Sequence, residues 1–123
     1  MINHSYILYI EDDQSMAELV RQALKLRGYS VVSAQSGQQG LSMMRERKPD
    51  LLLLDLMMPN LNGWDIYRAV KTDQTLANIP VIVITARSIA NDRTVIADLP
   101  PADDYITKPF DVQHLLHSVQ NLL

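Results

Sequence analysis

The sequence has 123 residues, of which 47% are hydrophobic, so it can bury one hydrophobic core but hardly two, and we expect a single domain over residues 1–123. The formal net charge of -3, with no run of lysine or arginine, argues against direct binding to nucleic acid or to an anionic membrane surface. Cysteine is absent, which excludes disulfides and thiolate metal sites, and no signal peptide or membrane span is visible, so we expect a soluble cytoplasmic protein.

The first half of the chain alternates between strand and helix patterns. Tyr6–Ile10 is a short apolar run that stops at three consecutive acids, which predicts a β-strand. Apolar residues then recur at helical spacing over Met16–Leu24, and this helix is expected to close at Gly28. A weaker strand pattern follows at Val31–Ala34, and a shorter helix is expected before Pro49.

The second half continues the alternation. Leu51–Leu54 and Val81–Ile84 are unbroken aliphatic runs, which are typical of parallel strands covered by helices on both faces, so these strands should be central. A helix is expected between them, over Trp64–Val70. A helix of poor periodicity, a short strand and a clearly amphipathic helix then complete the pattern at Ile89–Leu99, Tyr105–Thr107 and Val112–Leu122.

Five alternations of strand and helix with short connections predict an α/β fold, a doubly wound, five-stranded parallel sheet with five flanking helices. In such a sheet the carboxyl ends of the strands share one edge, where ligands bind. The residues at those ends here are Glu11, Asp12, Asp55, Thr85 and Lys108. We therefore expect these five residues to converge in one pocket.

The acids of this expected pocket predict a bound cation. Two carboxylates roughly 5 Å apart repel by about 3 kcal/mol at an effective dielectric near 20, so Glu11, Asp12 and Asp55 need a positive charge among them. Oxygen ligands favour Mg²⁺, for which Mn²⁺ should substitute, whereas Zn²⁺ is disfavoured without suitably spaced histidine or cysteine. For the neighbouring Asp13 we favour a role in capping the following helix.

Asp55 is the expected nucleophile of the pocket. It follows four leucines, and a carboxylate in so apolar a setting is either a buried structural partner or a reactive group. A reactive carboxylate can accept a phosphoryl group as an acyl phosphate, with a cation and a hydroxyl to hold the phosphoryl oxygens. Lys108 and Thr85 supply those groups, although each alone is equally well explained as a surface lysine and an ordinary strand threonine.

Four segments in this order resemble the receiver domain of two-component response regulators. They are Tyr9–Asp13, Leu54–Pro59 with Asn62-Gly63, Ile79–Ala86 and Asp103–Phe110. The resemblance extends over essentially the whole chain and implies a flavodoxin-like sheet with the strand order 2-1-3-4-5.

The resemblance also implies a phosphorelay chemistry for the pocket. Asp55 would accept the phosphoryl group from a histidine kinase or a histidine phosphotransfer protein. Asp12, Asp55 and the carbonyl group of Met57 would bind Mg²⁺ directly, and Glu11 would act through a bound water. The domain would catalyse its own phosphotransfer and autodephosphorylation, with no outside substrate to turn over.

Three further roles follow from the same resemblance. Thr85 and Lys108 would each hold a phosphoryl oxygen, and Thr85 and Tyr105 would form a switch. Phosphorylation would draw Thr85 inward and let the Tyr105 ring turn, which changes a surface read by an unidentified effector. On the residues alone, Tyr105 is equally well an ordinary strand aromatic.

Two other classes of protein share parts of this pattern. A metal-dependent phosphohydrolase with an aspartate nucleophile is the main alternative, but it needs a second acid two residues after the nucleophile, where this chain has Met57. A flavin-binding protein needs a phosphate-binding loop rich in serine, threonine and glycine after the first strand, where Glu11–Asp13 would repel the phosphate.

Overall fold

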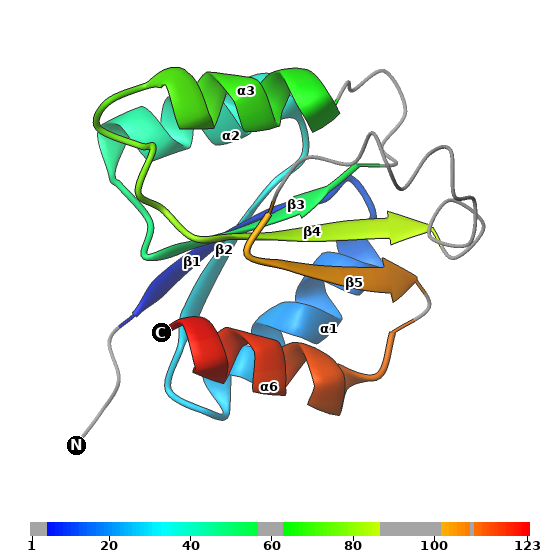
Figure 1. The fold of residues 1–123 in the computed structure, drawn as a ribbon. Coiled ribbons are helices and arrows are strands. Elements are labelled where there is room, and N and C mark those ends of the chain that lie inside the picture. The colour runs from blue at the N-terminus through cyan, green and yellow to red at the C-terminus, as the bar shows by residue number, and fades with distance from the viewer. Residues whose placement is uncertain (1–4, 57–62, 87–101, 109) are drawn as a thin grey trace.

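The computed structural model describes residues 5–56, 63–86, 102–108 and 110–123, with the backbone alone at Trp64, Thr85 and Ala86 (Figure 1). Its elements are β1 (Tyr6–Ile10), α1 (Gln14–Lys25), β2 (Ser30–Ala34), α2 (Gly37–Glu46), β3 (Leu51–Asp55), α3 (Gly63–Thr72), β4 (Val81–Ala86), β5 (Asp104–Lys108) and α6 (Val112–Leu122). All five predicted strands are present, with bounds that differ from the prediction by two residues at most.

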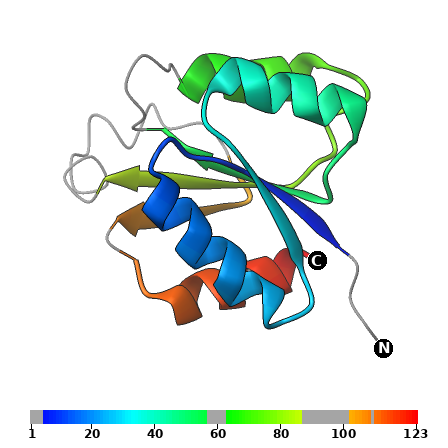
Figure 2. The ribbon, with the colours of Figure 1, turned by 180° about the vertical axis from the view of Figure 1, so that it is seen from behind.

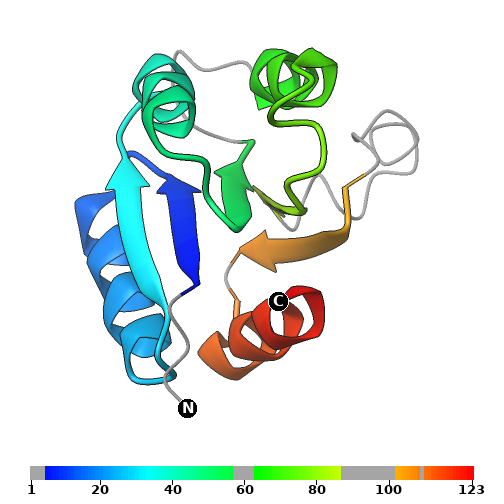
Figure 3. The same ribbon diagram turned by 90° about the vertical axis from the view of Figure 1, so that its left-hand side faces the viewer.

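The five strands form one parallel sheet in the order β2-β1-β3-β4-β5, which confirms the predicted flavodoxin-like topology. α2 and α3 cover one face of the sheet, and α1 and α6 cover the other (Figures 1 and 2). The view in Figure 3 shows the twist of the sheet between these two layers. Four of the five predicted helices lie in the described part of the chain, and the one expected at Ile89–Leu99 lies outside it.

The sheet divides the hydrophobic core into two clusters. Every residue of β1 and β3 is buried, which explains why these strands read as continuous apolar runs with no alternation. Alternate residues still point to opposite faces: Leu53 packs with α1 and α6, whereas Leu52 and Leu54 pack with α2 and α3. Gly40 lets α2 approach β1 closely, because a Cβ atom there would lie 2.5 Å from Ile10 Cδ1.

Local signals set the ends of α1. The side chain of Asp13 accepts hydrogen bonds from the backbone N–H groups of Ser15 and Met16, at 3.0 and 3.1 Å, so the predicted capping role of Asp13 is confirmed. The helix ends at Lys25, and Gly28 has a positive φ of 91°, a conformation that favours glycine. The Gly28 N–H donates to the Lys25 carbonyl at 3.0 Å and the Tyr29 N–H donates to the Leu24 carbonyl at 3.1 Å, so Gly28 closes the helix as predicted.

Two aspartates fasten the amino-terminal edge of the sheet in the same way. The Asp50 N–H donates to the Tyr6 carbonyl at 2.7 Å, and the Tyr6 N–H donates back to Asp50 Oδ2 at 2.7 Å. Asp103 and Val81 repeat this reciprocal pair, at 3.0 and 2.8 Å. Each aspartate thus satisfies the first N–H of the neighbouring strand, which would otherwise lack a partner at the sheet edge.

Asp50→Ala should lower the free energy of unfolding by about 1–2 kcal/mol, because the part-buried N–H of Tyr6 loses its acceptor. Urea denaturation measures this change. Asp50→Asn keeps an acceptor oxygen and is the matched control, so it should lose less stability than Asp50→Ala. Equal midpoints for the alanine variant and the wild type would contradict the role assigned to this hydrogen bond.

Candidate functional site

Three of the predicted site residues leave the sheet on the same face. Each follows, by two positions, a buried residue of the cluster beneath α1 and α6, and residues two apart on a strand share a face. Glu11 follows Tyr9, Asp55 follows Leu53, and Lys108 follows Ile106. Since β1 and β3 pair in register with Ile10 opposite Leu54, Glu11 and Asp55 extend from neighbouring positions.

Lys108 bridges the two carboxylates. Its Nζ atom lies 2.6 Å from Asp55 Oδ2 and 2.8 Å from Glu11 Oε1, although the three residues are far apart in the sequence. The side chains of Glu11 and Asp55 are only 1% and 2% exposed, whereas that of Lys108 is 27% exposed. The predicted convergence of Glu11, Asp55 and Lys108 therefore holds, and one ammonium group serves two buried acids.

One ammonium group cannot neutralise the negative charges of two buried carboxylates. Burial and the hydrogen-bonded neighbour Asp55 raise the pKa of Glu11 to about 8, although Lys108 opposes the shift. Burial lowers the pKa of Lys108, but its hydrogen bonds to Asp55 and Glu11 outweigh burial and raise it overall. At neutral pH the site therefore holds a proton on Glu11 and a charged Lys108, and a further cation would favour release of the Glu11 proton.

Of the other two predicted ligands, Asp12 lies in the described part of the chain and Met57 lies outside it. Asp12 is exposed and follows Glu11 directly. Among residues 5–56, 63–86, 102–108 and 110–123, no cluster of three or more carboxylate, histidine or cysteine side chains is arranged to hold a metal ion. The donor set itself, three carboxylates within two strand ends, has the hard oxygen chemistry that suits Mg²⁺.

Thr85 lies near the end of β4, where its backbone pairs with Thr107 of β5, one position before the pair formed by Ala86 and Lys108. β4 is the strand between β3 and β5, so Thr85 stands between the strand ends that carry Asp55 and Lys108. The backbone of Thr85 therefore lies at the predicted position along the sheet edge, and its side chain is not among the groups that the structure describes.

Tyr105 occupies the face of β5 opposite to Lys108. Its half-buried ring packs against the cluster beneath α2 and α3, which includes Tyr67. The Tyr105 hydroxyl accepts a hydrogen bond of 2.9 Å from the backbone N–H of Ala102. The sequence did not predict this contact, which fixes the end of the ring to the segment that enters β5.

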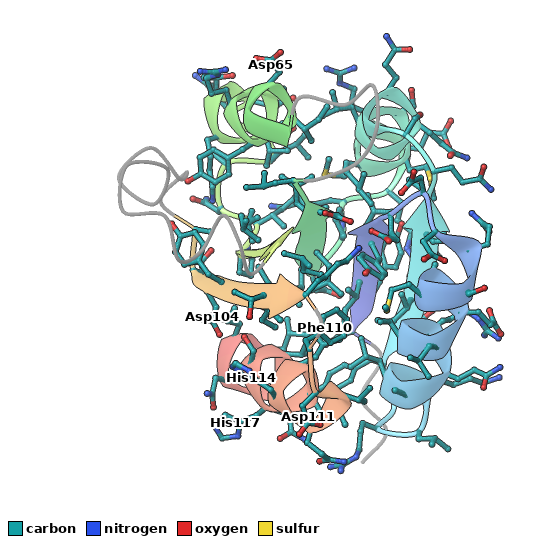
Figure 4. All side chains as sticks on the ribbon, turned by 90° about the vertical axis from the view of Figure 1, so that its right-hand side faces the viewer. Asp65, Asp104, Phe110, Asp111, His114 and His117 are labelled. Atoms are coloured by element: carbon teal, nitrogen blue, oxygen red, sulfur yellow. The ribbon has the colours of Figure 1, made fainter. Side chains whose placement is uncertain are left out.

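The structure also adds two polar features that sequence reasoning missed. Asp104, an edge-strand residue, accepts a hydrogen bond from the buried Ser118 hydroxyl of α6 (Figure 4 labels Asp104). Tyr9 buries its whole side chain beneath the acidic site. The only signal for Tyr9 was an aromatic phenol within an otherwise aliphatic strand end.

A family model described as the response regulator receiver domain matches residues 7–120, and the chain belongs to this family. It is 39% identical over 117 residues to the DNA-binding dual master transcriptional regulator RpaA of Synechocystis, a match that covers 95% of this chain and 48% of that protein. The chain spans about half the length of the curated relatives it matches.

Solved structures agree with this assignment. The signal receiver domain of a signal transduction histidine kinase from Syntrophus aciditrophicus is 30% identical, with a TM-score of 0.86 over 97% of this chain and 89% of that one. The response regulator protein TrrA from Thermotoga maritima, in complex with Mg²⁺-BeF, is 26% identical, with a TM-score of 0.81 over 97% of this chain and 99% of that one.

The chain is therefore a signalling receiver, and the family match favours this function over the phosphohydrolase alternative. None of the helices that the structure describes has the length and apolar character of a membrane span.

Proposed function

We propose that Asp55 is the phosphoacceptor of this receiver and that a histidine kinase or a histidine phosphotransfer protein supplies the phosphoryl group. The observation that carries the proposal is the buried Asp55 carboxylate with the Lys108 ammonium 2.6 Å away. A carboxylate oxygen of Asp55 attacks phosphorus, the bond between phosphorus and the donor's histidine nitrogen breaks, and that nitrogen keeps the electron pair.

Lys108 and Thr85 hold the transferred group. The ammonium group of Lys108 pairs with one phosphoryl oxygen, which requires it to release part of its contact with Asp55. The Thr85 hydroxyl and the Ala86 N–H donate to another phosphoryl oxygen, in keeping with their position between β3 and β5. Because Asp55 is 2% exposed, water has little access to the acyl phosphate, and autodephosphorylation is slow relative to that of an exposed acyl phosphate.

Mg²⁺ is the cofactor that the donor set favours, and Mn²⁺ should replace it. Asp12, Asp55 and the Met57 carbonyl would hold the ion, and Glu11 would act on it through a water. When bound, the ion neutralises charge on the phosphoryl oxygens. The complex of TrrA with Mg²⁺-BeF supports this choice of metal by family likeness.

Tyr105 and Thr85 carry the switch. The Tyr105 ring packs against the cluster beneath α2 and α3, and the backbone of Thr85 lies in the neighbouring strand β4. Movement of Thr85 toward the phosphoryl group changes the space beside Tyr105, and the ring turns after its hydrogen bond from Ala102 breaks. The equilibrium between the two ring positions sets which surface an effector meets.

The wider setting is also part of the proposal. Curated relatives of about twice the length include a DNA-binding regulator, so the output of a longer protein can lie in a second domain while this acidic receiver does not itself contact nucleic acid. The downstream effector is unidentified. A cytoplasmic location stays a prediction of the sequence.

Incubation with Mg²⁺ and acetyl phosphate, followed by intact mass spectrometry, tests the phosphoacceptor. The wild type should gain one phosphoryl group, and Asp55→Asn should gain none, because the amide cannot act as the nucleophile. Asp65→Asn is the matched control: this exposed residue of α3 forms an ion pair with Arg68 on the surface and should be labelled as the wild type (Figure 4). A label that persists in Asp55→Asn would overturn the assignment.

A further inference from the structure

Tyr9 buries a phenol without a visible reason. Its side chain is 0% exposed, and its hydroxyl has no hydrogen-bond partner among the residues that the structure describes. Leaving a buried hydroxyl unpaired costs about 1–3 kcal/mol, and a phenylalanine would fill the same space without that cost. The carboxyl-terminal half of β1, which is otherwise aliphatic, has therefore accepted a polar group at a position where packing does not require one.

A second buried polar atom without a described hydrogen-bond partner, Glu11 Oε2, belongs to a residue on the same face of the sheet as Tyr9. Among the side chains that the structure describes, Tyr9 Oη and Glu11 Oε2 are the buried nitrogen or oxygen atoms that lack a hydrogen-bond partner. The other carboxylate oxygen of Glu11, Oε1, accepts from Lys108 at 2.8 Å. The two unpaired atoms thus belong to residues i and i+2 of one strand end, directly below the acidic site.

The two residues are near neighbours in space. They project from the same face of one strand, and Glu11 is the foremost of the acids that raise the pKa of Tyr9, so the phenol and the carboxyl lie within electrostatic range of each other. One water with two hydrogen bonds of about 2.8 Å each spans up to about 5.6 Å. Buried waters are found where two or more otherwise unpaired polar groups face one polar space.

We propose that one buried water joins Tyr9 Oη to Glu11 Oε2, so that Tyr9 is a positioning residue for the acidic site. The tyrosine donates to the water, and the water donates to Glu11 Oε2, which serves as the acceptor when the Glu11 proton lies on the oxygen that faces Asp55 and Lys108. Burial raises the pKa of Tyr9, and the nearby acids Glu11, Asp55 and Asp13 raise it further, so the phenol keeps the proton that it donates. The bridge holds Oε2 in place while Oε1 contacts Lys108, and this fixes the carboxylate plane toward Asp55.

The expected effect of Tyr9 on Mg²⁺ binding rests on the proposed function, whereas the water bridge between Tyr9 and Glu11 does not. Urea denaturation of metal-free protein therefore tests the bridge alone. Tyr9→Phe should lower the urea midpoint in the wild type, because Glu11 loses its donor. In the background of Glu11→Met, which is similar in volume but has no oxygen, Tyr9→Phe should instead raise the midpoint, because the hydroxyl then has no partner to lose.

Two results would overturn the bridge. A midpoint raised by Tyr9→Phe in both backgrounds means that the hydroxyl is unpaired, and a midpoint lowered in both means that its partner is not Glu11. Tyr29→Phe is the matched control, since Tyr29 is buried in the same cluster near the opposite end of the sheet. Its effect on the midpoint should be the same with and without Glu11→Met.

Titration calorimetry with Mg²⁺ tests the positioning role. Tyr9→Phe should weaken Mg²⁺ binding about three- to ten-fold, which corresponds to one hydrogen bond, and should cause no further loss in the Glu11→Met background. Unchanged Mg²⁺ affinity in Tyr9→Phe overturns the positioning role. A wild type that binds no Mg²⁺ and takes no label on Asp55 instead overturns the proposed function, and the urea experiment still decides the bridge.

Discussion

Lys108→Met should remove about 3 kcal/mol from the free energy of unfolding at neutral pH and slow phosphorylation of Asp55 by about 100-fold or more. The methionine keeps most of the apolar stem but leaves Glu11 and Asp55 without the ammonium group that contacts both. Phosphotransfer slows because a positive charge no longer meets the phosphoryl oxygens. Urea denaturation and the time course of labelling by acetyl phosphate measure the two effects.

Lys25→Met is the control for this substitution, because Lys25 is exposed in the last turn of α1, at the end of the helix far from the acidic site. It should keep the wild-type labelling rate and most of the stability. The loss of stability in Lys108→Met should also shrink at acid pH, because protonation of the site removes the negative charge that Lys108 offsets. A Lys108→Met protein that is labelled at the wild-type rate would contradict the role given to this lysine.

Without a divalent cation, the protein should lose stability as the pH rises from 5 to 8. The folded state holds the pKa of Glu11 at about 8, above the value of 4.5 for an unperturbed glutamate, so over this range the folded protein binds a proton that the unfolded chain has released. The stabilisation is complete below the unfolded pKa and disappears as the pH passes the folded pKa. The slope for one such group is at most about 1.4 kcal/mol per pH unit.

Glu11→Gln should flatten that slope, since the amide does not titrate, and urea denaturation at a series of pH values measures the difference. Glu18→Gln is the matched control on the exposed surface of α1. Hydrogen bonds from Arg21 and Gln22 lower the pKa of Glu18 to about 2, so its titration lies below the tested range. A slope that is the same in the wild type and in Glu11→Gln would show that Glu11 does not hold its proton in the folded state.

Several elements could be predicted from the sequence because their signals are local. The aliphatic runs at Leu51–Leu54 and Val81–Ile84 predicted central strands, and β3 and β4 are the third and fourth strands of the sheet order. The capping role of Asp13 needed only its position before an amphipathic helix. The convergence of Asp55 and Lys108 followed from the rule that parallel strands end at one edge.

The detailed geometry of the site could not be predicted, and the reason lies in the same buried strands. When both faces of a strand are apolar, the alternation that distinguishes the faces disappears, so nothing in the sequence tells which face a terminal residue takes. Glu11 and Asp12 therefore looked equivalent, yet Glu11 is buried against Lys108 and Asp12 is exposed. For the same reason the sequence could not show that the Tyr9 side chain lies on the face of the acidic site, with its hydroxyl unpaired among the described residues.

The most direct test of the central proposal is to locate the phosphoryl group chemically. Borohydride reduction of a protein labelled by acetyl phosphate converts a phosphorylated aspartate to homoserine, and peptide mass spectrometry then identifies the residue. The proposal predicts homoserine at position 55 in the wild type after labelling with Mg²⁺, and none there when Mg²⁺ is removed by a chelator. Homoserine at position 12, or at any other aspartate with position 55 unchanged, would contradict it.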